Sequence, residues 1–545
     1  MYATYAIVAA ALVGGAGAFG CAALLGFEDT TLRENEGGLP PGEDSGTIEG
    51  GGTTDAGSSA ITVTPARPVV RRGGSIELAI DVVRSGTSTG ELTATLVDLP
   101  AGVTAEPAAI AAGATKGVVK ITATSVATLG PATTRLTVTG GAGAGTAIPP
   151  LEVPLLVADP AGAVDTTFDT DGVVIDATKA LTGTFYALAI AGDGSILAGG
   201  AGNGAAANAG WMLRRFSAAG AADAAFTTAA APGLPANNEL RAIAIDGMGR
   251  IVCAGASVPP AGAQALLTVA RFTATGALDA TFAGGVVRIP LAETPLGSSA
   301  FAVAVQPTGA IVVVGSRNDA GAGQTGIVLR FADNGTRDAT FNGGATLTIA
   351  DTRLVGVAIE AGGNIVLGGT TTPGAPAAYV VTRRTTTGAI DNTFGTNGVA
   401  TFATGSRANA FVRMPNGPFA LAGDVRTGPA AYTAGLAGPN GAPLFARSVT
   451  LSATGAFNAL AAPDEATIIA AGHATGANGE ARVERLLADG GAKDPAFGDA
   501  GTSLLDPGAN GFDLTLFAAA IQKDGRILVA GNRSNAGAVI YRLWP

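Results

Sequence analysis

The chain has 545 residues, enough for two to four domains, and its 82 glycines with only 14% charged residues favour short strands joined by tight turns over long helices. The net charge of −10 arises mostly in residues 28–59, where eight acids and one base give −7 and leave −3 for the rest. The composition excludes collagen, because Gly follows no three-residue period, and the lack of a basic patch argues against nucleic-acid binding.

The N-terminal residues are typical of an exported protein. Residues 5–27, YAIVAAALVGGAGAFGCAALLGF, are uncharged and apolar, as in the hydrophobic region of a signal peptide. The element AFGC at 18–21 resembles a bacterial lipobox, which implies that residues 1–21 are a signal, that cleavage precedes Cys21, and that Cys21 is lipidated. An uncleaved membrane anchor is the alternative, because 23 apolar residues are long enough to span a bilayer.

Residues 22–60 are predicted to be a flexible acidic linker. After Phe27 this segment is polar and rich in Gly, Pro and Ser, and it cannot bury enough apolar surface to fold. Such a linker would hold the folded part away from a membrane surface.

Residues 61–158 show the two-residue alternation of half-buried strands. In SIELAIDVV (75–83), Ile76, Leu78, Ile80 and Val82 share one face, and further strands are predicted at 92–96, 117–123, 134–138 and 151–157. About seven short strands in a hundred residues suggest an Ig-like β-sandwich. The phrase at 98–117, DLPAGVTAEPAAIAAGATKG, resembles Ig-like modules of bacterial cell-envelope proteins.

A repeated phrase organises residues 159–545. RFTATGALDATFAGG (271–285) returns as RFADNGTRDATFNGG (330–344), and the spacing between successive copies is 51–59 residues. The phenylalanine of the phrase falls at Phe168, Phe226, Phe282, Phe341, Phe394, Phe445 and Phe497. Paired strands around a Gly turn follow each copy, as in AVAVQPTGAIVVVGS (302–316), so each unit is predicted to contain about four antiparallel strands.

These copies resemble the delta-60 repeat family, whose signature is R-F…G-x-x-D-x-x-F…DG-x-I-x-V-x-G. The resemblance implies a β-propeller-like fold on an exported protein and no established common activity.

We call the repeated phrase a joint; in five joints an Arg precedes an Asp by eight or nine positions. The pairs are Arg215/Asp223, Arg271/Asp279, Arg330/Asp338, Arg383/Asp391 and Arg485/Asp494. In the sixth joint Leu436 and Ala442 stand near these places, so both charges are lost together, which indicates that the two side chains face each other.

Two residues do not fit this spacing: Asp165 has no Arg eight or nine positions before it, and Arg542 has no Asp after it. A closed ring would bring them together and remove exposed sheet edges, which predicts a seven-bladed β-propeller. An open solenoid is the alternative. The Arg, Asp and Phe residues of the joints are interpreted as structural rather than catalytic.

Few residues point to chemistry. The single histidine, His473, is interpreted as a solvent-facing turn residue, and Cys253, in RIVCAG, as a small buried hydrophobe. The stretch GTSTG (86–90) matches the nucleophile-elbow pattern by chance, and DTTFDTDG (165–172) is calcium-like but lacks a later bidentate Glu. Trp211 and Trp544 are interpreted as packing at the ring closure.

The sequence therefore predicts an all-β chain: an Ig-like β-sandwich followed by a seven-bladed β-propeller. We expect a non-enzymatic, monomeric cell-envelope lipoprotein without cofactor, which binds a protein or glycan at the cell surface through its propeller loops. It would be anchored at the outer membrane or cell surface by lipid, or be periplasmic or secreted if not lipidated. The alternatives are a propeller-channel enzyme of lyase or dehydrogenase type, favoured by three or more inward titratable residues, and a structural spacer.

Overall fold

The computed structural model describes the chain in segments. They are residues 48–49, 60–84, 89–140, 148–176, 183–202, 210–226, 238–258, 264–290, 296–320, 323–371, 377–402, 405–415, 417–425, 431–450, 455–474, 480–505, 514–534 and 536–545. The described regular elements are strands and two short 3-10 turns, so the all-β prediction is confirmed. No helix in these segments is long and apolar enough to cross a membrane. Residues 1–21 with Cys21, nearly all of the linker 22–60, and residues 86–88 of GTSTG lie outside them.

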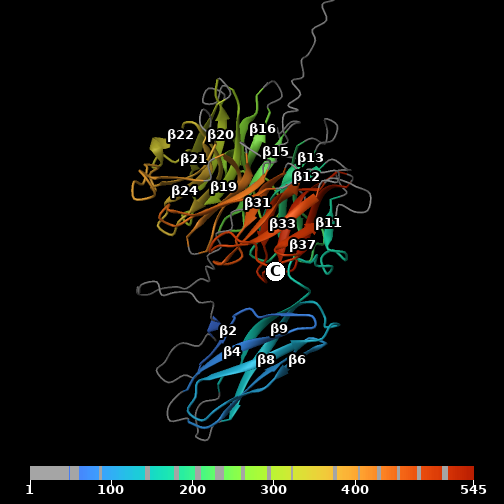
Figure 1. Cartoon of the computed structure of the whole chain (residues 1–545). Helices are drawn as coiled ribbons and strands as arrows, with labels where there is room; N and C mark the ends of the chain where they lie inside the picture. Colours follow the sequence, from blue (N-terminus) through green and yellow to red (C-terminus); the bar gives the residue numbers. More distant parts are fainter. Residues whose placement is uncertain are drawn as a thin grey trace, which may run out of the picture.

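The N-terminal folded unit consists of two five-stranded sheets, drawn below the rest of the molecule in Figure 1. The first sheet has the order β1 (Ile48–Glu49), β2 (Ala60–Thr64), β4 (Ser75–Val83), β8 (Lys116–Ala123) and β6 (Val103–Glu106). The second has the order β3 (Val69–Arg71), β10 (Leu151–Ala158), β9 (Gly130–Gly140), β5 (Leu92–Val97) and β7 (Ala108–Ile110). The strands predicted at 75–83, 92–96, 117–123, 134–138 and 151–157 all lie within these elements.

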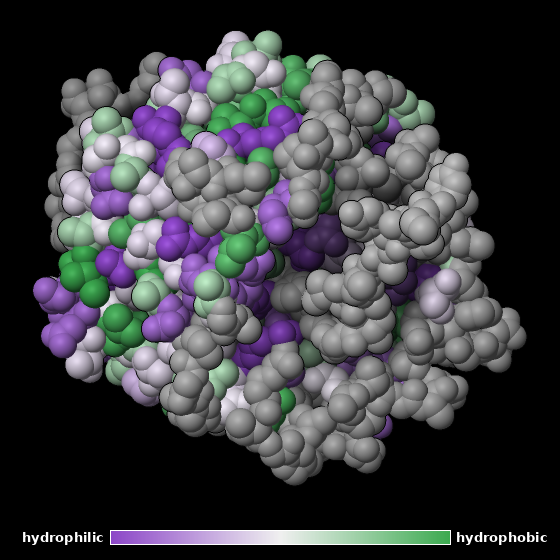
Figure 2. Space-filling view, turned by 90° about the horizontal axis from the view of Figure 1, so that it is seen from above, coloured by the Kyte–Doolittle hydropathy of each residue, from purple (hydrophilic) through white to green (hydrophobic). Residues whose placement is uncertain are grey.

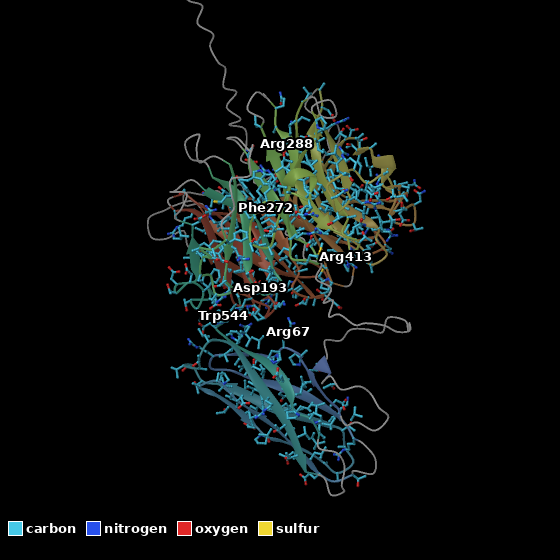
Figure 3. All side chains as sticks on the ribbon, turned by 180° about the vertical axis from the view of Figure 1, so that it is seen from behind. Arg67, Asp193, Phe272, Arg288, Arg413 and Trp544 are labelled. Carbon is cyan, nitrogen blue, oxygen red and sulfur yellow. The ribbon has the colours of Figure 1, made fainter. Side chains whose placement is uncertain are left out.

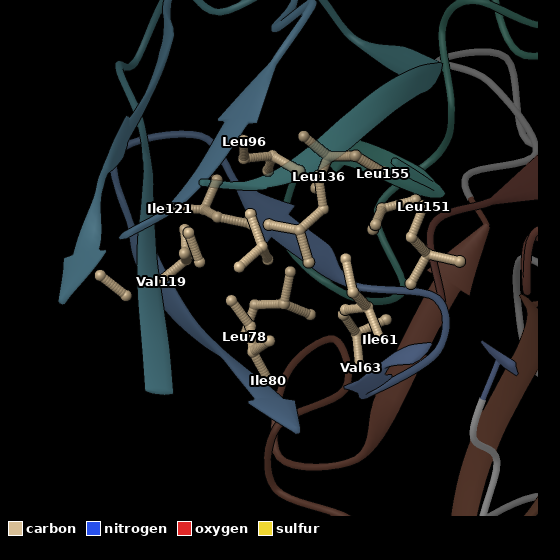
Figure 4. Packing of buried hydrophobic residues seen from close by; sticks show 14 of the residues in the cluster. Ile61, Val63, Leu78, Ile80, Leu96, Val119, Ile121, Leu136, Leu151 and Leu155 are labelled. Carbon is tan, nitrogen blue, oxygen red and sulfur yellow. The ribbon is translucent and has the colours of Figure 1, made fainter. Parts of the chain in front are cut away.

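The core of this unit lies between its two sheets. Along β4, Leu78, Ile80 and Val82 are buried while Glu77 is exposed, as the alternation of the sequence predicts. Side chains from both sheets, including Val119 and Leu136, meet in one apolar cluster (Figure 4). Because the described part of this unit contains no disulfide, its stability depends on this packing.

After Ala158 the described strands form seven small antiparallel sheets. The first sheet contains β12 (Gly183–Ile190), β13 (Ile196–Gly202) and β14 (Gly210–Phe216). The second contains β15 (Glu239–Ile245), β16 (Ile251–Ser257), β17 (Leu266–Phe272) and β18 (Val286–Arg288), and the third contains β19 (Ser298–Val305), β20 (Ile311–Asn318), β21 (Gln324–Phe331) and β22 (Leu347–Ile349). The fourth contains β23 (Thr352–Ile359), β24 (Ile365–Thr371), β25 (Tyr379–Arg384) and β26 (Val399–Phe402), and the fifth contains β27 (Ser406–Arg413), β28 (Phe419–Val425), β29 (Ala431–Ala437) and β30 (Pro443–Thr450). The sixth contains β31 (Gly455–Ala461), β32 (Thr467–Ala474), β33 (Glu480–Leu487) and β34 (Thr502–Leu505). The seventh contains β35 (Leu514–Ile521), β36 (Ile527–Arg533) and β37 (Gly537–Leu543), and β11 (Val173–Ile175) is its fourth strand.

The first strands of these sheets surround a common centre. β12 lies against β15, and contacts continue in order through β19, β23, β27, β31 and β35, which in turn lies against β12. The seven sheets therefore close on themselves, as expected of a β-propeller, and the open stack left as an alternative by the sequence is wrong.

Closure joins the beginning and the end of this region. β11 pairs antiparallel with β37, so a strand from residues 173–175 forms the outer edge of the last sheet. Backbone hydrogen bonds run from Gly162 N to Trp544 O and from Trp544 N to Ala163 O, each 2.9 Å long. An apolar cluster containing Phe185 and Leu528 fills the space between the first and last sheets.

The two-sheet unit contacts the propeller close to this closure. Trp544 is fully buried in a cluster with Leu156 and Ala158 at the end of β10. Arg71 donates from Nη1 to Asp159 O (2.6 Å) and from Nη2 to Pro545 O (2.7 Å). Figure 3 shows Trp544 at this end of the propeller and Arg67 on the facing end of the two-sheet unit.

Ring closure generates a specific prediction for Leu528. This side chain is fully buried against the first sheet, whereas an open stack would leave the same face in water. We expect Leu528→Asp to lower the thermal unfolding midpoint by about 10 °C or more, because it buries a charge. Leu504→Asp is the control, because Leu504 is 54% exposed. Equal midpoints for the two variants in calorimetry would contradict closure.

Candidate functional site

Six Arg–Asp pairs form in the joints, including the pair separated by the whole propeller sequence. In each, the Arg Nε donates to the Asp Oδ2 over 2.7–2.8 Å. The pairs are Arg215–Asp223, Arg271–Asp279, Arg330–Asp338, Arg383–Asp391, Arg485–Asp494 and Arg542–Asp165. The last pair is fully buried, and Arg526 Nη1 also contacts Asp165 Oδ2 at 3.1 Å.

The other oxygen of each Asp shapes the turn that follows. Asp279 Oδ1 accepts a hydrogen bond from the amide of Thr281, two residues further along, which is an Asx-type turn. The same bond, 2.9–3.0 Å long, recurs in all six joints, from Thr167, Ala225, Thr281, Thr340, Thr393 and Ala496. One carboxylate thus joins the third strand of a sheet to its turn.

The turn brings the phenylalanine three residues after the Asp under the guanidinium group. Arg–ring distances are 4.6–5.1 Å, within the range of cation–π contacts, at Phe168, Phe226, Phe282, Phe341, Phe394 and Phe497. These arginines keep a structural partner on every side, which supports their interpretation as structural residues.

In five joints the arginine also contacts the next joint. Arg271 Nη1 donates to Asp333 O in the following joint (2.6 Å), and equivalent bonds reach Ala218, Ala274, Thr386 and Pro439. Gly276 has a φ of +89°, and a Cβ there would lie 3.0 Å from the Phe226 ring of the preceding joint. Only glycine fits this position, which explains the G of the repeated phrase.

The sixth joint differs from the others in its backbone. Phe445 lies within β30 and pairs with Leu436, whereas the six other repeat phenylalanines lie outside strands. The equivalence that the spacing predicted for Phe445 is therefore wrong. Without an Asp carboxylate to hold the longer turn, the chain reverses over Gly438–Ala442 directly into the fourth strand.

Four of the paired carboxylates, those of Asp223, Asp279, Asp338 and Asp391, have pKa values below the ordinary range. Hydrogen bonds from the Arg215 guanidinium lower the pKa of Asp223, and those from Thr393, followed by the charge of Arg383, lower the pKa of Asp391. A lowered folded-state pKa stabilises the protein above the unfolded value of about 3.9, and this stabilisation is lost as the pH falls through the folded pKa. At the closure, burial and then the charge of Arg526 lower the pKa of Arg542 to about 10.

A second repeated feature lies on the first strand of every sheet. Each of these strands contains a β-bulge at the same place, where one residue has no partner on the second strand. The seven bulged residues, which we call the bulge ring, are Tyr186, Arg241, Phe301, Val355, Asn409, Asn458 and Phe517.

A glycine within the last four residues of the second strand of each sheet is required by this bulge. A Cβ on Gly315 would lie 2.0 Å from the carbonyl oxygen of Ser299 on the first strand. The same conflict, at 1.8–2.2 Å, exists at Gly200, Gly255, Gly369, Gly423, Gly472 and Gly531. The glycine therefore permits the bulge.

Most of the bulge ring is filled by stacked side chains. Tyr186 and Phe517 contact edge to face, with centroids 5.1 Å apart. The Arg241 guanidinium lies 5.1 Å from the Tyr186 ring and 5.7 Å from the Phe301 ring. The Arg353 guanidinium also contacts Phe301 and lies 4.7 Å from the centroid of its ring.

The fifth and sixth sheets place hydrogen-bonding groups at this level instead. Asn409 Nδ2 donates to Asp424 Oδ1 (3.1 Å) and lies 3.5 Å from Asn458 Oδ1. Asn458 Nδ2 lies 3.2 Å from His473 Nδ1 and donates to Leu516 O (3.0 Å). Arg407 Nε lies 3.4 Å from Asp424 Oδ1. We call Arg407, Asn409, Asp424, Asn458 and His473 the polar cluster.

The placement of His473 corrects its interpretation as a solvent-facing turn residue. It lies in β32, half-buried, and opposite Ala456. Asp424 and His473 stand at matching ends of β28 and β32, where the second strands of other sheets carry Ala201, Ala256, Ser316, Thr370 and Asn532. When the repeats are aligned, Asp424 and His473 stand out against these mostly small residues, and this difference could have revealed the cluster from the sequence.

A recess lies on the propeller face turned away from the two-sheet unit. Figure 2 looks onto this face and shows hydrophilic atoms deep near its middle. In the described part of the chain, no group of three or more His, Cys, Asp or Glu side chains has the arrangement of a metal site.

The remaining sequence candidates have structural positions. Asp171 Oδ1 accepts a hydrogen bond from Val173 N in the calcium-like stretch (3.1 Å). Cys253 is fully buried as predicted, and burial raises the pKa of its thiol. Trp211 lies near the start of β14 and donates to Ala256 O in the second sheet, so its interpretation as packing at the ring closure is wrong. Trp544 follows β37, bonds to the start of the propeller at the closure, and also packs against the two-sheet unit.

The joint geometry predicts how charge removal affects stability. Arg271→Leu leaves Asp279, which is 7% exposed, without its guanidinium, and we expect a loss of about 3 kcal/mol in unfolding free energy. Arg271→Leu combined with Asp279→Ala reproduces the uncharged sixth joint and should recover part of this loss. Urea unfolding measures both. If the double variant loses as much unfolding free energy as Arg271→Leu and Asp279→Ala lose together, or more, the two side chains do not act as a pair.

Comparisons with known proteins agree with the repeat. Residues 306–341, from the turn after β19 to the joint phenylalanine, match a β-propeller domain of unknown function, DUF5122. No curated protein matches the chain. The solved polysaccharide lyase Uly1 is 9% identical with a TM-score of 0.37, covering 66% of this chain and 89% of its own. A mutant apocarotenoid oxygenase from Synechocystis is 10% identical with a TM-score of 0.31, covering 87% and 94%. The family match and the sheets together identify a β-propeller-type repeat protein.

Proposed function

We propose that this chain is an exported cell-envelope protein in which an Ig-like β-sandwich carries a seven-bladed β-propeller of delta-60-type repeats. The two facing five-stranded sheets support the sandwich, and seven sheets in cyclic contact support seven blades. The propeller acts as a monomeric binding or scaffolding module for a protein or glycan, without catalysis and without a cofactor.

The observation that carries a binding role is the division of the propeller into two faces. On one face, the sandwich contacts the propeller near the ring closure, through Trp544 and Arg71. The opposite face bears the recess, with hydrophilic atoms near its middle (Figure 2). A concave surface that offers a few polar groups is a common site of recognition.

A propeller-channel enzyme is the second candidate, because Arg407, Asp424 and His473 form a set of three titratable residues around the ring centre. The contacts among these residues favour binding. Asp424 and His473 are joined through the amides of Asn409 and Asn458, which place several hydrogen-bonding groups side by side.

Binding and catalysis are distinguished by one experiment. The purified full chain carrying Cys21→Ala is labelled and mixed with envelope polysaccharides and envelope proteins. We expect saturable binding to one of these fractions and unchanged polysaccharide length on gel filtration. Shortened polysaccharide with new unsaturated or oxidised ends would establish an enzyme, and the absence of binding to either fraction would leave a structural spacer.

The lipid anchor is tested separately with the two cysteines of the chain. In a bacterial host, we expect the native chain to incorporate labelled palmitate and to sediment with membranes, and Cys21→Ala to lose both properties. Cys253→Ala is the matched control and should keep them, because Cys253 is buried in β16. Membrane retention of unlabelled Cys21→Ala chain would instead indicate an uncleaved anchor.

A further inference from the structure

The polar cluster departs from the repeat at linked positions. At the bulge ring, Asn409 and Asn458 stand where five other sheets carry Tyr, Arg, Phe or Val side chains. Asp424 and His473 follow on the adjoining second strands. Four changes that contact one another across two sheets constitute one feature rather than separate substitutions.

This cluster is not a self-sufficient structural network. Asn409 is fully buried, and its Oδ1 atom accepts no hydrogen bond from the residues that the structure describes. A buried acceptor without a donor costs about 1–3 kcal/mol, so polar networks that serve stability satisfy all their members. The cost borne at Asn409 indicates that the cluster serves recognition.

The chemistry of the cluster selects for hydroxyl groups. Asp424 and Asn409 offer carboxylate and amide oxygens as acceptors, and Arg407 lies beside them as a donor. Acceptors and donors side by side match vicinal hydroxyl groups, each of which both donates and accepts. An isolated cation or anion would use only one kind of group.

An apolar surface adjoins these polar groups. Asn458 Nδ2 bonds to Leu516 O, next to Phe517, and Phe517 contacts Tyr186. Both rings are half-buried. A sugar ring combines hydroxyl groups at its edge with an apolar C–H face, and it is the ligand class that uses both surfaces.

We propose that the polar cluster and the rings of Tyr186 and Phe517 bind one sugar unit of a glycan at the centre of the propeller. This inference rests on the proposed binding function and deepens it by naming the ligand class. Asp424 and the other residues of the polar cluster bind the hydroxyl groups of the sugar. The site breaks no bond in the sugar, which is released unchanged.

The experiment uses the full chain carrying Cys21→Ala and isothermal titration calorimetry. The probes are methyl glucoside, methyl mannoside, methyl galactoside, N-acetylglucosamine and galacturonate, with short oligosaccharides of each. We expect at least one probe to bind, and Asp424→Asn to weaken it by about tenfold or more, because a hydrogen bond to a charged group is lost. Asn409→Leu should weaken binding too.

Asn334→Leu is the matched control. Asn334 is exposed on the joint face, so this variant should bind like the native chain. The thermal midpoint of each variant shows whether it folds, and Asp424→Asn is nearly isosteric. A native chain that binds none of the probes, or sugar binding that Asp424→Asn and Asn409→Leu leave unchanged, would overturn the proposal. Binding to envelope protein with no sugar binding would overturn it while leaving the wider binding function intact.

Discussion

The propeller depends on one aspartate carboxylate in six of its seven joints, which accepts hydrogen bonds from two directions. In the second sheet, Asp279 binds the Arg271 guanidinium through Oδ2 and the Thr281 amide through Oδ1. The first bond fixes the turn to its sheet, and the second sets the direction in which the chain continues. The phenylalanine three residues on is thereby placed under the guanidinium and beside the next joint. A local turn thus becomes the contact between neighbouring sheets.

The bulges impose a second constraint, which separates structure from specificity. The backbone conflict at glycines such as Gly315 fixes where each bulge lies. The identity of the bulged side chain is left free, and the seven positions carry five different residue types. The same backbone therefore presents aromatic rings on one side of the centre and amides on the other.

Features that recur in the sequence were the predictable ones. The Arg–Asp pairing was inferred from repeated spacing and from its joint loss at Leu436 and Ala442, and this logic extends to Arg542 and Asp165 at opposite ends of the propeller. Strand β4 was predicted because one of its faces is buried along its length. Spacing alone failed at Phe445, where the strand begins earlier because no Asp holds the turn. The bulge ring could not be predicted, since a bulge interrupts alternation and no single residue type marks its position in all seven copies. The contact through Trp544 and Arg71 occurs once, so no repetition reveals it.

The uncharged sixth joint lies in the fifth sheet, whose neighbour is the sixth sheet. Across this boundary Asn409 and Asn458 meet, on the side of the ring remote from the joints. Five sheets clamp the following sheet through an arginine, from Arg215, Arg271, Arg330, Arg383 or Arg542. Leu436 has no charge with which to do so. Among the described residues, the two sheets without this arginine bond are the fifth and the sixth, which carry Asn409 and Asn458. The side of the ring where the two amides meet is therefore also the side where no arginine joins a sheet to the one that follows it.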